Sequence, residues 1–141
     1  MDSLRVHPIG MVKESGFSED GPKVKDVSSV VATIEILREY SMGLAGLEGE
    51  QRVDVVFWLD RVDPEERRDL MSRSSRPSDK DKGVFATRRP QRPNPIGVTR
   101  VELIEIEKNR LTVKGLDAYP GTPILDIKPA RQRLKSGAKT G

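Results

Sequence analysis

Apolar and polar residues alternate along several short stretches of this chain, with the period of two that is typical of β-strands. Residues 30–36 place Ala32, Ile34 and Ile36 on one face, with polar side chains between them. Residues 53–59, VDVVFWL, form an almost continuous apolar run rich in β-branched and aromatic residues. The first pattern predicts a strand with one buried face, and the second predicts a central strand covered on both faces.

Two further strand patterns meet at a short polar pair, which is typical of a β-hairpin. Residues 98–107 and residues 110–114 flank the pair Lys108–Asn109. The apolar face of the first strand changes parity at Ile104, which indicates a β-bulge because an extra residue shifts the alternation by one. Residues 124–127 predict a last short strand.

Helical patterns are scarce in the sequence. Residues 40–47 predict a short helix that Ser41 would cap, and residues 64–72 predict a second one with a proline at its first position and acids in its first turn. Polar residues with glycines and prolines predict a loop over 15–26, and a second break over 63–82 combines the short helix with a polar stretch over 72–81. Many short strands favour a mainly β fold, a single small β-barrel domain with short helices, over a layered α/β fold.

The composition limits the possible architectures and sites. The 141 residues fit one domain, which we expect to be a barrel over residues 1–130 followed by a basic C-terminal tail over 131–141. No apolar run is long enough to cross a membrane and no secretory signal is present, so we expect a cytoplasmic protein. Cysteine is absent and His7, in a presumed N-terminal strand, is the only histidine, so we expect no disulfide or metal site and interpret His7 as structural.

Basic residues gather in two parts of the chain, although the formal net charge is only +3. The two groups are Lys80, Lys82, Arg88, Arg89, Arg92 and Arg100, and then Lys128, Arg131, Arg133, Lys135 and Lys139. Such groups attract phosphate backbones, although solvated surface charge is the more common explanation of a basic run. The tail is therefore a candidate for contacts with a phosphate backbone.

Three prolines, at positions 90, 93 and 95, stiffen the segment that follows the strand-like stretch GVFAT (83–87), because each fixes its own φ angle and restricts the residue before it. We therefore expect the Arg88 side chain, at the end of that stretch, to be held in place. The stiff segment carries Arg88, Arg89, Arg92 and Asn94. Guanidinium groups on a preordered backbone suit the binding of a carboxylate or a phosphate. A rigid surface loop without a ligand is an equally weighted alternative.

Two aspartates fall in the segment GLDAYPGTPILDIKP, residues 115–129. Asp117 lies in the first turn of this segment, where we expect a contact with a ligand. Asp126 lies among apolar strand residues, where an acid is costly to bury unless it is paired. We therefore interpret Asp126 as the partner of a buried arginine. The glycines of the chain match neither a dinucleotide-binding fingerprint nor a phosphate-binding loop.

These segments resemble those of the tRNA N6-threonylcarbamoyladenosine methyltransferase family, the TrmO-like and TsaA-like β-barrel proteins. The most specific segments are GVFATR (83–88), RPNPIG (92–97), GLDA (115–118) and GTPILDIKP (121–129), and the weaker ones are PIG (8–10), YSMGLAGLEG (40–49) and VVFWLDR (55–61). The resemblance covers residues 8–129. The chain departs from the family in its first loop, which has Pro22-Lys23-Val24 for Pro-Arg-Gln, and at Arg89 and Ala130, where serine and tyrosine are usual.

The resemblance implies a homodimeric β-barrel enzyme that uses S-adenosylmethionine to methylate N6 of threonylcarbamoyladenosine beside the anticodon of tRNA. It implies cofactor contacts at Pro22, Lys23, Asp60, Arg61, Arg88, Val98, Leu116 and Asp117. The N6 lone pair is delocalised, so a general base or a nearby charge would help the reaction. Asp117 and Tyr119 are the candidates for this base, and the sequence does not decide between them.

Two other functions fit parts of the sequence. A non-catalytic tRNA- or nucleotide-binding barrel would use the basic segments, but the aromatic content of 4% leaves few platforms on which bases stack. A regulator that senses the cofactor is a third interpretation. Binding of S-adenosylmethionine separates the enzyme from the nucleic-acid-binding barrel, and methyl transfer to tRNA separates it from the sensor.

Overall fold

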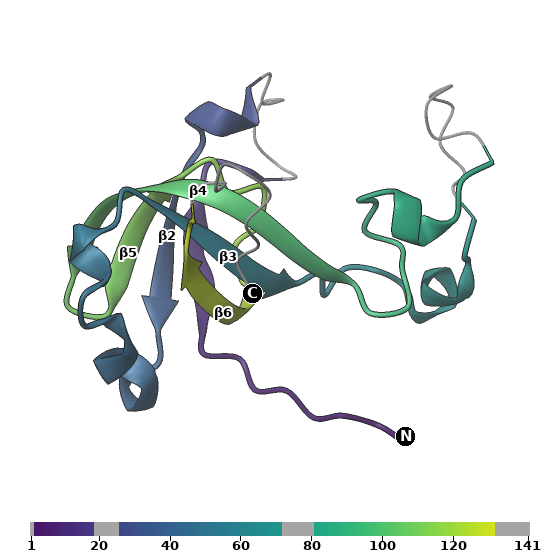
Figure 1. Cartoon of the computed structure of the whole chain (residues 1–141), viewed down its shortest axis with the longest axis horizontal. Helices are drawn as coiled ribbons and strands as arrows, with labels where there is room; N and C mark the ends of the chain where they lie inside the picture. The colour runs from purple at the N-terminus through teal and green to yellow at the C-terminus, as the bar shows by residue number, and fades with distance from the viewer. Residues whose placement is uncertain (1, 19–25, 72–80, 132–141) are drawn as a thin grey trace, which may run out of the picture.

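Six antiparallel strands close into a barrel in the order β1-β2-β5-β4-β3-β6 (Figure 1). The computed structural model describes residues 2–18, 26–71 and 81–131. The strands are β1 (Gly10–Ser15), β2 (Val31–Ile36), β3 (Arg52–Trp58), β4 (Ile96–Glu107), β5 (Arg110–Lys114) and β6 (Pro123–Pro129). The predicted mainly β barrel with short helices is confirmed.

Alternate residues of the strands point into the barrel and form one hydrophobic core. Ala32, Ile34 and Ile36 of β2 are at most 2% exposed, as their sequence pattern predicts. The buried members of the core are Val12, Ala32, Ile34, Ile36, Val53, Val55, Phe57, Val101, Leu111, Val113, Leu116, Ala118 and Ile124. Removal of this aliphatic surface from water is the main source of the barrel's stability.

The side chains on the outer side of β3 are less buried than the sequence predicts. Val55 and Phe57 are buried, whereas Val56 and Trp58 are only half-buried. A closed barrel has one interior, so alternate side chains of β3 lie on its outer surface, and the expected covering of both faces is wrong. The Trp58 ring is partly shielded by Arg67, whose guanidinium carbon lies 5.5 Å from the ring centroid.

The hairpin between β4 and β5 agrees with the sequence pattern. Glu107 pairs with Arg110 across the two-residue turn, in which Lys108 has a φ of +56°. The β4–β5 register shifts around Ile104, so the predicted bulge is confirmed. The bulge leaves the Ile104 side chain 51% exposed on the outer surface.

Short 3-10 helices occupy the connections: η1 (Val27–Ser29), η2 (Arg38–Leu44), η3 (Leu47–Gly49), η4 (Pro64–Arg68) and η6 (Val84–Ala86). The helix predicted over 40–47 is wrong in its start and its type. η2 begins at Arg38, its N-cap is Leu37 rather than Ser41, and Gly46 with a φ of +88° separates it from η3. The glycines of this segment favour two short turns over one α-helix.

The bounds of one helix and one strand also differ from the sequence predictions. η4 begins with Pro64 as predicted, and Asp63 and Glu66 form a capping box, but the helix ends at Arg68 rather than at residue 72. β1 begins only at Gly10, so the presumed strand around His7 is wrong, and the His7 side chain is exposed.

Residues 60–94 connect β3 to β4 and project away from the barrel; we call them the arm (Figure 1). The arm contains η4 and η6, and a β-bridge between Met71 and Gly83 joins its two described halves. Among the arm residues that the structure describes, Val84 is the only buried one. The arm therefore depends more on polar contacts than on a core.

Candidate functional site between the barrel and the arm

A cavity of about 940 Å³ lies where the arm meets the barrel. Segments that are distant in sequence contribute to its lining: Phe17 beyond β1, most of residues 57–62 at the end of β3, residues 85–88 and most of 90–94 in the arm, residues 96–99 of β4, and residues 117–119 and Thr122 before β6. The cavity has the size of a small-molecule site and combines apolar walls with a few charged groups.

Two residues of the motif RPNPIG fix the start of β4. Pro95 is buried, and its carbonyl oxygen accepts a hydrogen bond of 2.7 Å from the Leu59 N–H, which continues the ladder between β3 and β4. At Gly97 a Cβ would lie 2.6 Å from the Phe57 ring. Glycine is therefore required for the ring to lie against β4 at the pocket wall.

Arg88 links the arm to β4, because its Nη2 donates to the carbonyl oxygen of Val98 at 2.8 Å. The Leu103 N–H donates to the Gln51 carbonyl, and hydrogen-bonded pairs alternate in an antiparallel ladder. This alternation places Val98 at a non-hydrogen-bonded position, so that its N–H and C=O point away from β3. The pairing with β5 starts only at Glu102, so the edge of β4 at Val98 is open to the arm.

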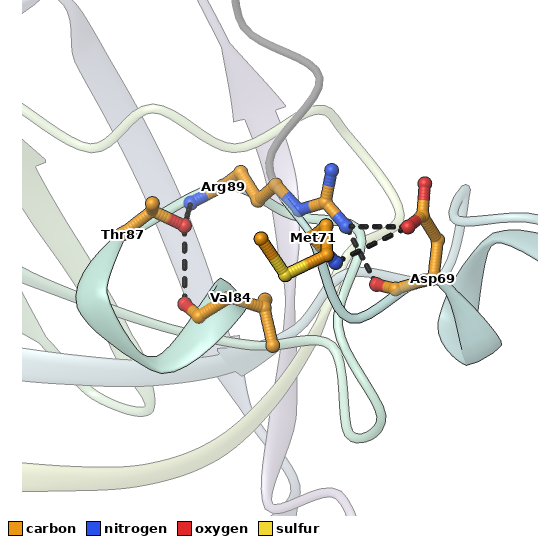
Figure 2. Close-up of polar contacts among 5 residues, drawn as sticks. All are labelled: Asp69, Met71, Val84, Thr87 and Arg89. Atoms are coloured by element: carbon orange, nitrogen blue, oxygen red, sulfur yellow. Dashed lines mark hydrogen bonds and ion pairs between the residues drawn. The ribbon is translucent and has the colours of Figure 1, made fainter. Parts of the chain in front are cut away.

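The strand expected for GVFAT is a 3-10 helix. Val84–Ala86 form η6, and the Thr87 hydroxyl donates to the Val84 carbonyl at 3.0 Å (Figure 2). Arg88 therefore follows a tight turn instead of a strand. Its side chain is nevertheless held, as expected, by the hydrogen bond to Val98.

Arg89 braces the arm rather than lining the pocket (Figure 2). Its Nη2 donates to the Asp69 carbonyl oxygen at 2.6 Å and lies 3.8 Å from the Asp69 carboxylate. The same carboxylate accepts a hydrogen bond of 3.2 Å from the Met71 N–H. The buried Nε of Arg89 has no hydrogen-bond partner among the described residues. This guanidinium thus ties the two halves of the arm together.

Two other arginines also bind backbone carbonyls of the arm. Arg92 Nη1 donates to the carbonyl oxygens of Thr87 and Arg89, each at 3.1 Å. Arg67 Nε donates to the Pro93 carbonyl at 2.8 Å. For Arg89 and Arg92 the structure favours the alternative of a rigid loop over the binding of an anion. Their guanidinium groups donate to backbone carbonyl oxygens of the arm, which lack partners in a helix or sheet.

The turn GLDA presents one charged side chain to the pocket. Gly115 has a φ of +102°, and Leu116 and Ala118 are 0% and 2% exposed, which anchors the turn in the barrel core. Asp117, between them, is exposed and lines the pocket. Its Oδ1 accepts a hydrogen bond of 2.8 Å from the Thr99 hydroxyl on β4.

An aromatic and cationic stack forms the adjoining wall. The Phe17 and Tyr119 ring centroids are 4.8 Å apart, and the Arg61 guanidinium carbon lies 4.3 Å from the centroid of Tyr119. The Thr122 hydroxyl donates to the Tyr119 carbonyl at 2.7 Å and fixes the backbone there. The stack brings Tyr119, one of the two candidate bases, into the same cavity as Asp117.

Asp126 does not have the buried arginine partner that we expected. Its side chain is 49% exposed and pairs with Lys128 at 3.2 Å, and its Oδ1 accepts from the Ile127 N–H. The β3–β6 register places Asp126 opposite Val56, on the outer surface of the barrel. An exposed acid needs no buried partner, so that interpretation is wrong.

The structure gathers most of the predicted cofactor residues at this cavity. Asp60, Arg61, Arg88, Val98 and Asp117 all line it. The Leu116 side chain lies in the barrel core instead, and Pro22 and Lys23 lie outside the described residues. Sequence reasoning missed Thr99 and Phe17, since a threonine on a strand and an isolated phenylalanine carry no local signal of a site.

Two charged groups outside this pocket are held by local hydrogen bonds. Hydrogen bonds from the hydroxyl and N–H of Ser28 lower the pKa of Asp26, which caps η1. A two-point hydrogen bond to Asp54 raises the pKa of Arg100 on the barrel surface. Within the described ranges, no group of three histidine, cysteine or acidic residues could hold a metal ion, and no helix is long and apolar enough to cross a membrane.

A small closed barrel with an arm and a pocket at their junction defines the structural class of this chain. The tRNA-methyltransferase O N-terminal domain matches residues 14–135, and the chain belongs to that family. An S-adenosyl-L-methionine-binding protein of Archaeoglobus fulgidus is 40% identical over 122 residues, which cover 86% of this chain and 85% of that protein. A probable S-adenosyl-L-methionine-binding protein of Methanothermobacter thermautotrophicus is 38% identical and covers 94% of each chain.

Solved structures agree with this assignment. A crystal structure of TrmO superimposes with a TM-score of 0.73 at 31% identity, covering 100% of this chain and 61% of that one. TrmO from Pseudomonas aeruginosa superimposes with a TM-score of 0.70 at 32% identity, covering 92% and 57%. This chain therefore covers about three fifths of the length of those two proteins.

Proposed function

We propose that this protein is an S-adenosylmethionine-dependent tRNA methyltransferase that methylates N6 of threonylcarbamoyladenosine next to the anticodon. The observation that carries the proposal is the pocket at the junction of barrel and arm. It collects Arg61, Arg88 and Asp117 from three remote segments, in a chain of the tRNA-methyltransferase O family. Relatives in that family are named as binding S-adenosyl-L-methionine.

The chemistry of the pocket fits this cofactor. S-adenosylmethionine carries a carboxylate, an ammonium and an adenosine, and the pocket offers guanidinium groups, a carboxylate and apolar walls. Arg88 and Asp117 would hold its charged groups, and the Val98 N–H at the open edge of β4 would offer a backbone hydrogen bond. The cavity of about 940 Å³ is at the upper end for a single small ligand, so a substrate nucleoside has room beside the cofactor.

The residues of this chain would act mainly by positioning. When bound, the cofactor supplies a methyl group on a sulfonium, which is a good leaving group. The pocket would hold the attacking nitrogen in line and exclude water, which accounts for much of the rate of such a transfer. Of the two candidates for the group that takes the N6 proton, both of which line the pocket, Tyr119 is the one left free when Asp117 holds a charged group of the cofactor.

We also propose a homodimer that acts on tRNA in the cytoplasm. The dimer is supported by large apolar side chains on the arm that are left uncovered in one chain: Leu70 is 54% exposed, Met71 47% and Phe85 82%. The substrate is supported by the family and by the basic tail, of which the structure describes Arg131 alone. A strictly monomeric mass at high concentration would contradict the dimer.

Mass spectrometry of tRNA nucleosides tests the reaction. Incubation of the protein with S-adenosylmethionine and tRNA that contains threonylcarbamoyladenosine should yield its N6-methyl derivative. tRNA without the threonylcarbamoyl group and the Arg88→Ala variant are the matched controls, and both should yield little product. A folded protein that binds the cofactor and tRNA but transfers no methyl group would contradict the proposal and support a non-catalytic binding protein.

A further inference from the structure

Two consecutive residues of β4 hold a cation and an anion at the pocket. The Val98 carbonyl oxygen accepts from Arg88 Nη2 at 2.8 Å, and the Thr99 hydroxyl donates to Asp117 Oδ1 at 2.8 Å. Consecutive Cα atoms are about 3.8 Å apart, so the two anchors are neighbours. All four residues line the same cavity.

Neither charge is neutralised by an ion pair within the described part of the chain. None of the ion pairs among described residues involves Arg88 or Asp117. One guanidinium nitrogen of Arg88 is bound to the Val98 carbonyl, and one carboxylate oxygen of Asp117 is bound to the Thr99 hydroxyl. Among the described residues, the other N–H donors of Arg88 and the second oxygen of Asp117 are available to a ligand. A guanidinium and a carboxylate that line one cavity and are anchored on consecutive residues of β4 match a ligand that carries both charges.

The Asp117 carboxylate has two kinds of support. The neighbours Leu116 and Ala118 fix the backbone of the turn in the core, but they do not determine the rotation of the side chain. The Thr99 hydroxyl determines this rotation, since it donates a hydrogen bond to one of the two carboxylate oxygens. Thr99 is fixed by the β3–β4 ladder, where it pairs with the buried Val55.

We propose that Thr99 is a positioning residue, which aims the free oxygen of Asp117 at the ammonium of the cofactor's amino-acid end while Arg88 binds the carboxylate of that end. The inference rests on the proposed cofactor. An α-amino acid carries its ammonium and carboxylate on one carbon, and only an anion and a cation held close together can bind both. The ribose hydroxyls are the competing partner for Asp117, and the test below distinguishes them.

Calorimetry with two ligands tests this assignment without turnover. S-adenosylhomocysteine has the amino-acid end and no transferable methyl group, whereas 5′-methylthioadenosine has the nucleoside and no amino-acid end. Thr99→Val, which removes the hydroxyl and keeps the shape, should weaken binding of S-adenosylhomocysteine about fivefold, as expected for one lost hydrogen bond, and leave 5′-methylthioadenosine unchanged. Thr99→Ser should restore the affinity for S-adenosylhomocysteine.

Two further variants complete the test. Thr112→Val, on β5 away from the pocket, is the matched control and should alter neither ligand. Asp117→Asn, which keeps an acceptor for Thr99 and removes the charge, should also weaken S-adenosylhomocysteine alone, and it serves if Thr99→Val fails to fold.

The outcomes separate this inference from the proposed function. Wild-type protein that binds neither ligand would overturn both. Wild-type protein that binds S-adenosylhomocysteine while Thr99→Val binds it equally well would overturn the role of Thr99 alone. Equal weakening of both ligands by Thr99→Val and Asp117→Asn would assign Asp117 to the nucleoside and overturn the assignment to the ammonium.

Discussion

The barrel and the arm of this protein are stabilised in different ways. The barrel has a closed hydrogen-bond ladder and a core of fully buried aliphatic side chains. The described arm has one buried side chain, that of Val84, and is braced by Arg67, Arg89 and Arg92, which donate to its own carbonyl oxygens. Loss of a core contact should therefore destabilise the whole fold, whereas loss of an arm contact should act locally.

The pocket lies on the boundary between these two regions. Among its charged residues, Asp117 is oriented by the barrel through Thr99, and Arg88 is carried by the arm and hydrogen-bonded to β4. Ligand affinity should therefore respond to changes in the arm that leave the free energy of unfolding unchanged.

Ile34→Ala should have the largest effect, because Ile34 is 0% exposed in the core. Such a truncation lowers the free energy of unfolding by about 2–5 kcal/mol, measured by urea denaturation. Ile104→Ala is the matched control, since Ile104 is 51% exposed at the bulge. The control should change the free energy by about 0.5 kcal/mol or less. Equal losses in both variants would contradict the inward orientation of Ile34.

Arg88→Ala should weaken S-adenosylmethionine binding about ten- to a hundredfold, because a charged hydrogen bond contributes about 1.5–3 kcal/mol. Arg88→Lys should restore little, since an ammonium cannot form the paired hydrogen bonds of a guanidinium. Urea denaturation of both variants should match that of the parent. Calorimetry with cofactor alone decides the role: parental affinity together with lost tRNA binding would assign Arg88 to an RNA phosphate.

Arg89→Ala should loosen the arm and leave the barrel unchanged. Loss of the 2.6 Å hydrogen bond to the Asp69 carbonyl should raise amide exchange in η6 and weaken cofactor binding about fivefold through Arg88. Asp69→Ala is the matched control with a smaller effect, because the carbonyl acceptor stays. Hydrogen exchange followed by mass spectrometry measures both variants. Unchanged exchange in the arm of Arg89→Ala would show that this guanidinium is not its brace.

Removal of residues 131–141 should have the smallest effect on the fold and the pocket. Cofactor affinity should stay the same, while tRNA binding should weaken and depend less steeply on salt, because each lost phosphate contact reduces counterion release. Filter binding at two salt concentrations measures this. An unchanged tRNA affinity at low salt would show that the tail does not contact RNA.

Local patterns in the sequence predicted the strands β2 to β6 of the barrel, but they did not predict β1. The period-two alternation of β2, the hairpin at Lys108–Asn109 and the bulge at Ile104 were all predicted, because each depends on neighbouring residues in one strand or turn. The family resemblance also indicated five residues that line the pocket, Asp60, Arg61, Arg88, Val98 and Asp117.

The tertiary structure decided the residues whose roles depend on contacts between remote segments. Barrel closure leaves the outer side of β3 and the side chain of Asp126 exposed, which a single strand cannot reveal. The fold also determines which acceptor each arginine binds. Arg88 and Arg89 are adjacent in sequence, but Arg88 donates to Val98 on β4 and Arg89 donates to Asp69 in the arm. Thr99 becomes part of the pocket only because the closed barrel brings β4 to the turn that carries Asp117. The side-chain period of a strand is a local property, whereas strand order and hydrogen-bond partners are fixed by long-range packing.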